Sequence, residues 1–151
     1  MSRLPVSALT GLLIAAAAMV PAAPAAADAQ GDAIDQLNQI RASNEMSALR
    51  SSPTLDRSAT RYARQMIRTD YFGHASKIAV SSDFESAGET LALHDGGAPQ
   101  PGRTIASWMN SPGHRAVLLS SRFRWVGMGL ARGRIGSRLV TVWVAHVGGR
   151  R

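Results

Sequence analysis

Residues 139–147 constrain the fold of this chain more than any other segment. The run reads Leu-Val-Thr-Val-Trp-Val-Ala-His-Val, so it is apolar at nearly every position and rich in β-branched residues. Such a strand is expected to be covered on both faces. Residues 125–131 have a similar composition, and 132–137, which contain two glycines, separate the two runs. We therefore predict an α+β fold in which an antiparallel hairpin lies between helices, as a three-layer α-β-α sandwich.

Helical periodicity marks three segments before this hairpin. After a loop at 29–31, Asp32 is a good N-cap, and a first helix should run to about Met46. The pair Ser52 and Pro53 opens a second helix. Its apolar face consists of Leu55, Ala59, Tyr62, Ala63, Met66 and Ile67. The third helix contains Ile105, Trp108 and Met109 and is stopped by Pro112-Gly113. An apolar turn is expected at 117–119, and 72–101 should be mostly loop around an ordered segment at 86–93.

The first 27 residues have the features of a secretory signal peptide. Arg3 precedes the apolar run 8–20, and Ala25 and Ala27 form an Ala-x-Ala cleavage pattern. Cleavage is expected before Asp28, with a cut before Gln30 as the alternative. The sequence thus predicts a secreted protein, extracellular or periplasmic, in which residues 28–151 form a single domain with no transmembrane segment.

Composition excludes several classes of function. The chain has no cysteine, which rules out thiol catalysis and cysteine-based zinc sites. Its formal net charge is +7, and Lys77 is the only lysine. Export argues against nucleic acid as a partner and leaves anionic cell-envelope components as one interpretation, with simple solubility as the other. A basic stripe lies on the polar face of the second helix, formed by Arg57, Arg61, Arg64 and Arg68.

Few residues could carry chemistry, and none forms a local catalytic motif. His74, Glu89 and His114 lie near the ends of predicted elements, where a scaffold presents polar side chains. Ser76 and Ser111 are candidate nucleophiles. From the residues alone, a buried imidazole satisfied by a carboxylate is the alternative to a functional cluster. We expect His146 to be a core or rim histidine, His94 to be exposed, and the three tryptophans to serve packing.

Five segments in order resemble a known family. They are Leu37-Asn38-x-x-Arg41, Tyr71-Phe72-Gly73-His74-Ala75-Ser76, Gly88-Glu89-Thr90-Leu91-Ala92, Trp108-Met109-Asn110-Ser111-Pro112-Gly113-His114-Arg115 and Val126-Gly127-Met128-Gly129. Together they are similar to the CAP superfamily of cysteine-rich secretory, antigen 5 and pathogenesis-related proteins, in its cysteine-free bacterial SCP-like branch. The resemblance covers residues 34–148. It implies an α-β-α sandwich with a cleft in which His74 and His114 can bind a divalent metal, often zinc, beside Glu89.

Three positions depart from the family pattern. Thr90 replaces an asparagine, Ser111 stands where eukaryotic members have a second glutamate, and Ala145 stands where many bacterial members have glutamine. We predict a secreted binding module whose cleft, with His74, Glu89, His114, Ser76 and Ser111, takes a lipid, a peptide or an envelope component. No cofactor is required, and zinc binding at His74 and His114, with Glu89 as a possible third ligand, would be weak. The alternative is a zinc-dependent hydrolase with Glu89 as general base.

Overall fold

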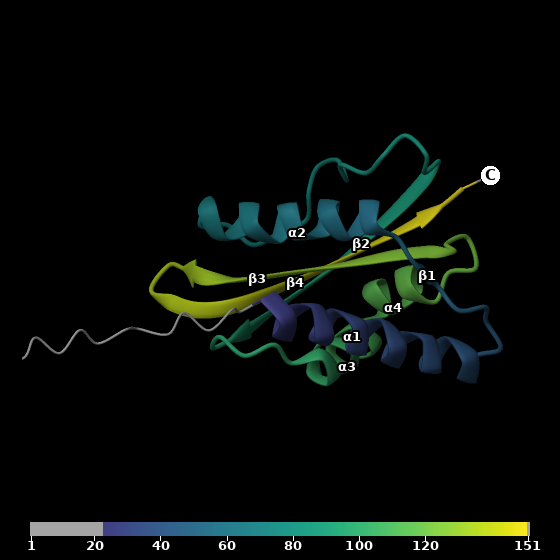
Figure 1. Ribbon diagram of the computed structural model, residues 1–151, viewed down its shortest axis with the longest axis horizontal. Coiled ribbons are helices and arrows are strands. Elements are labelled where there is room, and N and C mark those ends of the chain that lie inside the picture. The colour runs from purple at the N-terminus through teal and green to yellow at the C-terminus, as the bar shows by residue number, and fades with distance from the viewer. Residues whose placement is uncertain (1–22, 151) are drawn as a thin grey trace, which may run out of the picture.

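The computed structural model describes residues 23–150, so most of the expected signal peptide, residues 1–27, lies outside them. Figure 1 shows three layers, with helices above and below the sheet. The elements in chain order are α1 (Ala23–Ser43), β1 (Arg50–Ser51), α2 (Pro53–Arg68), β2 (Ser86–Asp95), α3 (Pro101–Asn110), α4 (Pro112–Leu118), β3 (Trp125–Ile135) and β4 (Arg138–Gly149). Helix α2 covers one face, and α1, α3 and α4 cover the other. The predicted α-β-α sandwich is confirmed.

The sheet has four strands in the order β1-β3-β4-β2. Strand β1 pairs in parallel with β3, and the other two pairings are antiparallel. The predicted hairpin is β3–β4. Its strands are longer than expected, because only Gly136 and Ser137 separate them, and Gly136 has the positive φ of 58° that a tight turn needs. Strand β4 is central and is buried from Val140 to Gly149, as its apolar composition predicts.

Each face of the sheet has its own hydrophobic core. One forms under α2, and the other lies between the sheet and the three remaining helices. Trp108 and Trp143 are fully buried, which agrees with their predicted packing role. Trp125 is only half-buried, and arginine side chains lie over its ring.

Helix α2 begins where the sequence predicts, and it lies unusually close to β3. The hydroxyl of Ser52 accepts a hydrogen bond from the Leu55 amide at 3.4 Å, with Pro53 at the first helical position. A Cβ at Gly127 would lie 2.2 Å from the backbone of α2, and so would one at Gly129. Only glycine permits this approach, which positions the α2 side chains that form the site described below.

The first helix begins earlier than predicted. Asp32 is not its N-cap, because α1 starts at Ala23 and includes the segment 29–31, and it ends at Ser43, before Met46. Alanine is the best helix former, and Ala29 is buried in the core beneath the sheet. Packing and propensity therefore extend the helix through a segment that contains glycine.

The structure corrects two further segments. Residues 86–95 form a full strand, because β2 pairs with β4 along its whole length. The expected apolar turn at 117–119 belongs largely to helix α4, in which Pro112 occupies the first turn. Pro112 therefore does not only follow α3 but also starts the next helix, as the fixed φ of proline permits.

The outer edge of β3 is covered by side chains beyond its short pairing with β1. The Met128 amide donates to Asp56 Oδ1 at 2.9 Å, and the Met128 carbonyl accepts from Gln30 Nε2 at 2.6 Å. These bonds tie both flanking helices to one residue of the strand. Among residues 23–150, no helix is long and apolar enough to cross a membrane.

Candidate functional site

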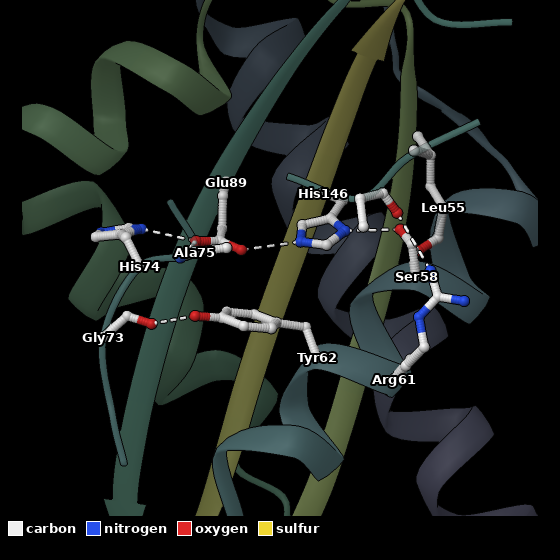
Figure 2. Close-up of polar contacts among 10 residues, drawn as sticks. Leu55, Ser58, Arg61, Tyr62, Gly73, His74, Ala75, Glu89 and His146 are labelled. Atoms are coloured by element: carbon white, nitrogen blue, oxygen red, sulfur yellow. Dashed lines mark hydrogen bonds and ion pairs between the residues drawn. The ribbon is translucent and has the colours of Figure 1, made fainter. Parts of the chain in front are cut away.

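Glu89 lies at the centre of a buried polar network (Figure 2). Its Oε1 accepts hydrogen bonds from His74 Nδ1 at 2.9 Å and from the Ala75 amide at 3.2 Å, and its Oε2 accepts from His146 Nε2 at 3.0 Å. Its side chain is only 3% exposed. Burial alone would raise the pKa of Glu89, but the bonds from His146, His74 and Ala75 outweigh burial and lower it. Glu89 is therefore an ionised carboxylate held by three donors.

Strand register brings Glu89 and His146 together. The two residues are direct partners on the antiparallel strands β2 and β4, so their side chains emerge on the same face of the sheet. His146 is also the register partner of Gly127 on β3. Because Gly127 has no side chain, α2 approaches here and places Ser58 against the imidazole of His146.

Ser58 links His146 to the backbone of α2. Its Oγ lies 2.7 Å from His146 Nδ1 and 3.0 Å from the Leu55 carbonyl oxygen. A hydroxyl has one hydrogen. If Ser58 donates to Leu55, then His146 Nδ1 must carry a proton, and if it donates to His146, then Nδ1 must be free. The position of one hydroxyl hydrogen is thus coupled to the charge of the imidazole that contacts Glu89.

His114 lies beside His74 rather than beside Glu89. The two imidazole centroids are 6.0 Å apart and tilted by 49°. Burial lowers the pKa of His114, and the charge of His74 lowers it further. Within residues 23–150, the hydrogen bonds to the Glu89 carboxylate come from other residues. In the same part of the chain, no group of three or more histidine or acidic side chains is arranged to hold a metal ion.

A cavity of about 400 Å³ opens between α2 and the segment that follows it. Its wall includes Ser58, Glu89 and His146 at the base and the side chains of Arg61, Tyr62, Tyr71, Ser76 and Lys77 above. Tyr62 donates to the Gly73 carbonyl at 2.6 Å and stacks on His146, with ring centroids 6.4 Å apart. Burial raises the pKa of Tyr62, and the charge of Glu89 adds to that increase. The tyrosine therefore remains a neutral hydrogen-bond donor.

The five predicted cleft residues do not all reach this cavity. His74, Glu89 and Ser76 line it, and the bond between His74 and Glu89 brings two of the predicted residues into contact. His114 lies against the ring of His74, which links it to the group. Ser111 joins α3 to α4 and is not part of the cavity wall among the residues that the structure describes.

The structure overturns the expectation for His94 and confirms the expectation for His146. The prediction that His94 is exposed is wrong: it is 5% exposed, and its Nε2 lies 2.8 Å from Thr104 Oγ1. Burial lowers the pKa of His94, as does the nearby charge of Arg103. His146 is a satisfied core histidine as expected, but it also belongs to the Glu89 network, from which the sequence interpretation left it out.

Sequence reasoning missed Ser58 and Tyr62. Both lie on the face of α2 that packs against the sheet. The available signal was a hydroxyl on the buried side of a strongly amphipathic helix, since Ser58 falls three residues after Leu55 and four before Tyr62. A buried hydroxyl requires a hydrogen-bond partner, which Ser58 finds both in the Leu55 carbonyl of its own helix and in His146 on the sheet.

Comparison with known proteins agrees with this architecture. Residues 34–147 match the family described as CAP, the cysteine-rich secretory protein family. The chain belongs to this family. It is also 30% identical over 119 residues to the uncharacterized membrane protein YlbC of Bacillus subtilis, a match that covers 73% of this chain and 34% of YlbC. The chain therefore spans about a third of the length of that relative.

Solved structures of low sequence identity share the CAP fold. An outer surface protein from Borrelia burgdorferi superposes with a TM-score of 0.66 at 18% identity, covering 82% of this CAP domain chain and 94% of that protein. An extracellular protein with an SCP domain from Bacillus anthracis also gives 0.66, at 20% identity, with 82% and 41% coverage. These likenesses establish the fold, and the second agrees with the bacterial SCP-like branch of the family.

Proposed function

We propose that this CAP protein is an exported binding module whose cavity takes an amphipathic, anionic ligand of the lipid type. The observation that carries the proposal is the cavity above the Glu89 network. Its volume of about 400 Å³ falls in the usual range for small-molecule sites, roughly 300–1,000 Å³. The aromatic rings of Tyr62 and Tyr71 supply apolar surface, and Arg61 and Lys77 supply positive charge.

The state of the network favours binding over catalysis. A general base works best when its pKa lies near the working pH. The pKa of Glu89 is lowered instead, and both of its oxygens already accept hydrogen bonds. His146 is engaged at both ring nitrogens. These groups stabilise the floor of a cavity, and a ligand would rest on them without being activated by them.

Titration with decanoate below its micellar concentration, followed by the NMR signals of the His74 and His146 rings, tests the cavity. Saturable shifts are expected, and decanol should bind more weakly because it lacks the charge. Arg61→Gln should weaken decanoate binding by at most about fivefold, since a solvent-exposed ion pair is worth about 0.2–1 kcal/mol. The matched control is Arg64→Gln, which removes an equal charge from the same helix outside the cavity wall. Equal loss in both variants, or no saturable shift, would reject this ligand class.

A weak divalent-metal contact at His74 and His114 accompanies the proposal. Glu89 holds His74 Nδ1, which leaves Nε2 of that ring available for a metal, and this carboxylate–histidine arrangement is the one that orients a metal-binding imidazole. Two imidazoles suit zinc by ligand type. Weak affinity is expected, because Glu89 is already saturated by donors and is a poor third ligand.

The hydrolase alternative is less well supported by this donor set. A catalytic zinc site usually has three protein ligands and an open position for water. Two imidazoles are at hand, and Glu89 would have to release its present donors to act as ligand or base. Zinc-dependent ester or peptide cleavage that is lost in Glu89→Gln would favour the hydrolase over a binding module.

Export is the remaining part of the proposal. A cut before Asp28 would remove the start of α1 and retain Ala29, which is 6% exposed and packs in the core, whereas a cut before Gln30 would remove it. Burial therefore supports Asp28 as the mature N-terminus. N-terminal sequencing of protein from the culture supernatant or periplasm tests this, and intact Met1 on cytoplasmic protein would contradict it.

A further inference from the structure

A second hollow, which we call the arginine pocket, lies at the end of the sheet where β1, β3 and β4 meet. It has a volume of about 460 Å³ and is lined by Ser47, Ala48, Arg50, Arg124, Trp125 and Arg150. It shares no lining residue with the cavity above Glu89. Backbone bonds fix its walls, because the Arg50 amide donates to the Arg124 carbonyl and the Arg124 amide donates to the Gly148 carbonyl.

Two positively charged guanidiniums lie over one aromatic ring in this pocket. The guanidinium of Arg150 lies 4.6 Å from the centroid of Trp125, and that of Arg50 lies 5.8 Å from it. Stacking on the ring positions both cations without neutralising them. The ion pairs seen among residues 23–150 involve His74, His146 and Arg138, and none of them includes an arginine of the pocket.

A fourth guanidinium is buried close by. Arg41 is fully buried, and its guanidinium donates to backbone carbonyls, including that of Leu118 at 2.6 Å and that of Ser47 at 2.9 Å. Burial lowers the pKa of Arg41, and the charge of Arg124 lowers it further, so the two cations lie within electrostatic reach of each other. The pocket thus combines three surface guanidiniums with a buried cation that is solvated by carbonyl groups.

We propose that the arginine pocket binds a phosphate group. The planar fork of arginine matches phosphate oxygens in a bidentate manner, and several guanidiniums can share one tetrahedral dianion. A carboxylate has two oxygens and one charge, so it would leave part of this set unpaired. The bound phosphate neutralises the repulsion that the unliganded pocket carries. Its source is either a small soluble phosphate or a phospholipid headgroup.

The test is a titration of the purified protein with inorganic phosphate at constant pH and ionic strength. Trp125 reports binding, because it is the half-buried tryptophan beneath the guanidiniums, whereas Trp108 and Trp143 are fully buried. A saturable fluorescence change is expected in the native protein. Calorimetry should give the same affinity for native protein and for Trp125→Phe, in which the fluorescence change disappears.

Variants that remove equal charge distinguish specific phosphate binding in the pocket from nonspecific attraction to a positively charged protein. Arg50→Gln combined with Arg124→Gln should weaken phosphate binding roughly tenfold or more. The control is Arg57→Gln with Arg64→Gln, which removes the same charge from α2 and should leave the affinity within about twofold. If the first pair unfolds, Arg150→Gln alone tests the pocket. No saturable binding, or equal loss in both pairs, would overturn the proposal.

Vesicles identify the source of the phosphate. Co-sedimentation with phosphatidylcholine vesicles that contain phosphatidic acid would assign the site to a lipid headgroup if it is lost in the pocket pair and kept in Arg103→Gln with Arg115→Gln. This control removes the same charge from exposed positions on α3 and α4, outside the pocket and outside the α2 stripe. Binding of free phosphate with no such sedimentation would assign it to small soluble phosphates.

Discussion

Replacing Glu89 with glutamine would remove one buried negative charge while keeping the size of the side chain. The amide can be accommodated: its oxygen accepts from His74 and Ala75, and its NH₂ group donates to His146 Nε2. His146 then carries its proton on Nδ1 and donates to Ser58, whose hydroxyl donates onward to Leu55. Every group remains paired, so the expected loss of unfolding free energy is only about 1–2 kcal/mol.

Glu89→Ala should be far more damaging than Glu89→Gln. The alanine variant leaves His146 Nε2 without an acceptor at a side chain that is 2% exposed, whereas His74 is 58% exposed and can bond to water. Leaving a buried polar group unpaired costs about 1–3 kcal/mol, and the cavity left by the shortened side chain adds to that cost. The difference between the two substitutions therefore measures the unpaired buried imidazole and the cavity together.

The pH dependence gives the sharper test. The pKa of Glu89 is held below its ordinary value of 4.5, so the folded state binds the proton more weakly than the unfolded chain. The stabilisation is present above pH 4.5 and is lost as pH falls through the folded pKa. Burial raises the pKa of Asp56, which gives the opposite slope, but that contribution is common to native protein and variant and cancels in the difference.

Urea unfolding followed by tryptophan fluorescence at pH 7, 6, 5 and 4 provides the measurement, since Trp108 and Trp143 are fully buried. The stability gap between native protein and Glu89→Gln should shrink toward pH 4. A gap that stays constant over this range would refute the assignment of an ionised Glu89. A loss in the glutamine variant as large as in the alanine variant would refute the proposed rearrangement at His146.

Other substitutions test the remaining parts of the structure. Gly127→Ala should destabilise the fold by about 1–3 kcal/mol in urea unfolding, because its Cβ would meet the α2 backbone at 2.2 Å, whereas Gly113→Ala, whose Cβ meets nothing within 4 Å, should cost much less. Zinc binding by calorimetry should weaken in His74→Ala and in His114→Ala; in the native protein it should also weaken in acid, as protons compete with the metal, and the lowered pKa of His114 moves its share of that competition below the ordinary histidine range. An equal zinc response in all three proteins would remove the histidine pair as a site. If the α2 stripe binds anionic envelope material, the amount of protein retained on isolated envelopes should fall steeply with added salt and after charge reversal of two of its arginines. If neither change reduces the retained amount, the stripe serves solubility. The stripe consists of Arg57, Arg61, Arg64 and Arg68, all of which are exposed.

The predictable parts of the fold are those whose sequence pattern lies within one short segment. Helix α2 has a cap, a proline and an apolar stripe within sixteen residues, and β4 is apolar throughout. Strand β2 has no comparable signal, because Gly, Glu and Ala are weak strand formers. It is a strand because β4 pairs with it from Ser86 to Asp95. Tertiary pairing here overrides propensity, and a single sequence does not encode that pairing in any short window.

The site likewise combines contacts that the sequence predicted with contacts that depend on tertiary structure. The proximity of His74 and Glu89 was expected from the family resemblance, and the structure contains that contact. The bond from His146 to Glu89 depends on strand register, and the contact of His146 with Ser58 depends on a glycine on a third strand. His94 was misplaced because its neighbours Asp95 and Gly96 are typical of loops, although it lies within β2 and reaches Thr104 on α3.

The bonds around Met128 have a consequence for how the molecule behaves at high concentration. A strand at the border of a sheet offers free amides and carbonyls to any other extended chain, and this is a common route to aggregation. Strand β1 pairs with β3 only at Trp125 and Val126, which leaves most of that border uncovered by a strand. At Met128 both backbone groups are already bonded to Asp56 and Gln30, so an incoming strand finds neither available.

Farther along the same border, the exposed charges of Arg132 and Arg134 oppose association of one copy with another. Asp56 and Gln30 thus prevent strand pairing between copies of the chain, in addition to linking α2 and α1 to the sheet. Conditions that protonate Asp56, or a truncation that removes Gln30, would open the border of β3 while leaving the cavity above Glu89 in place.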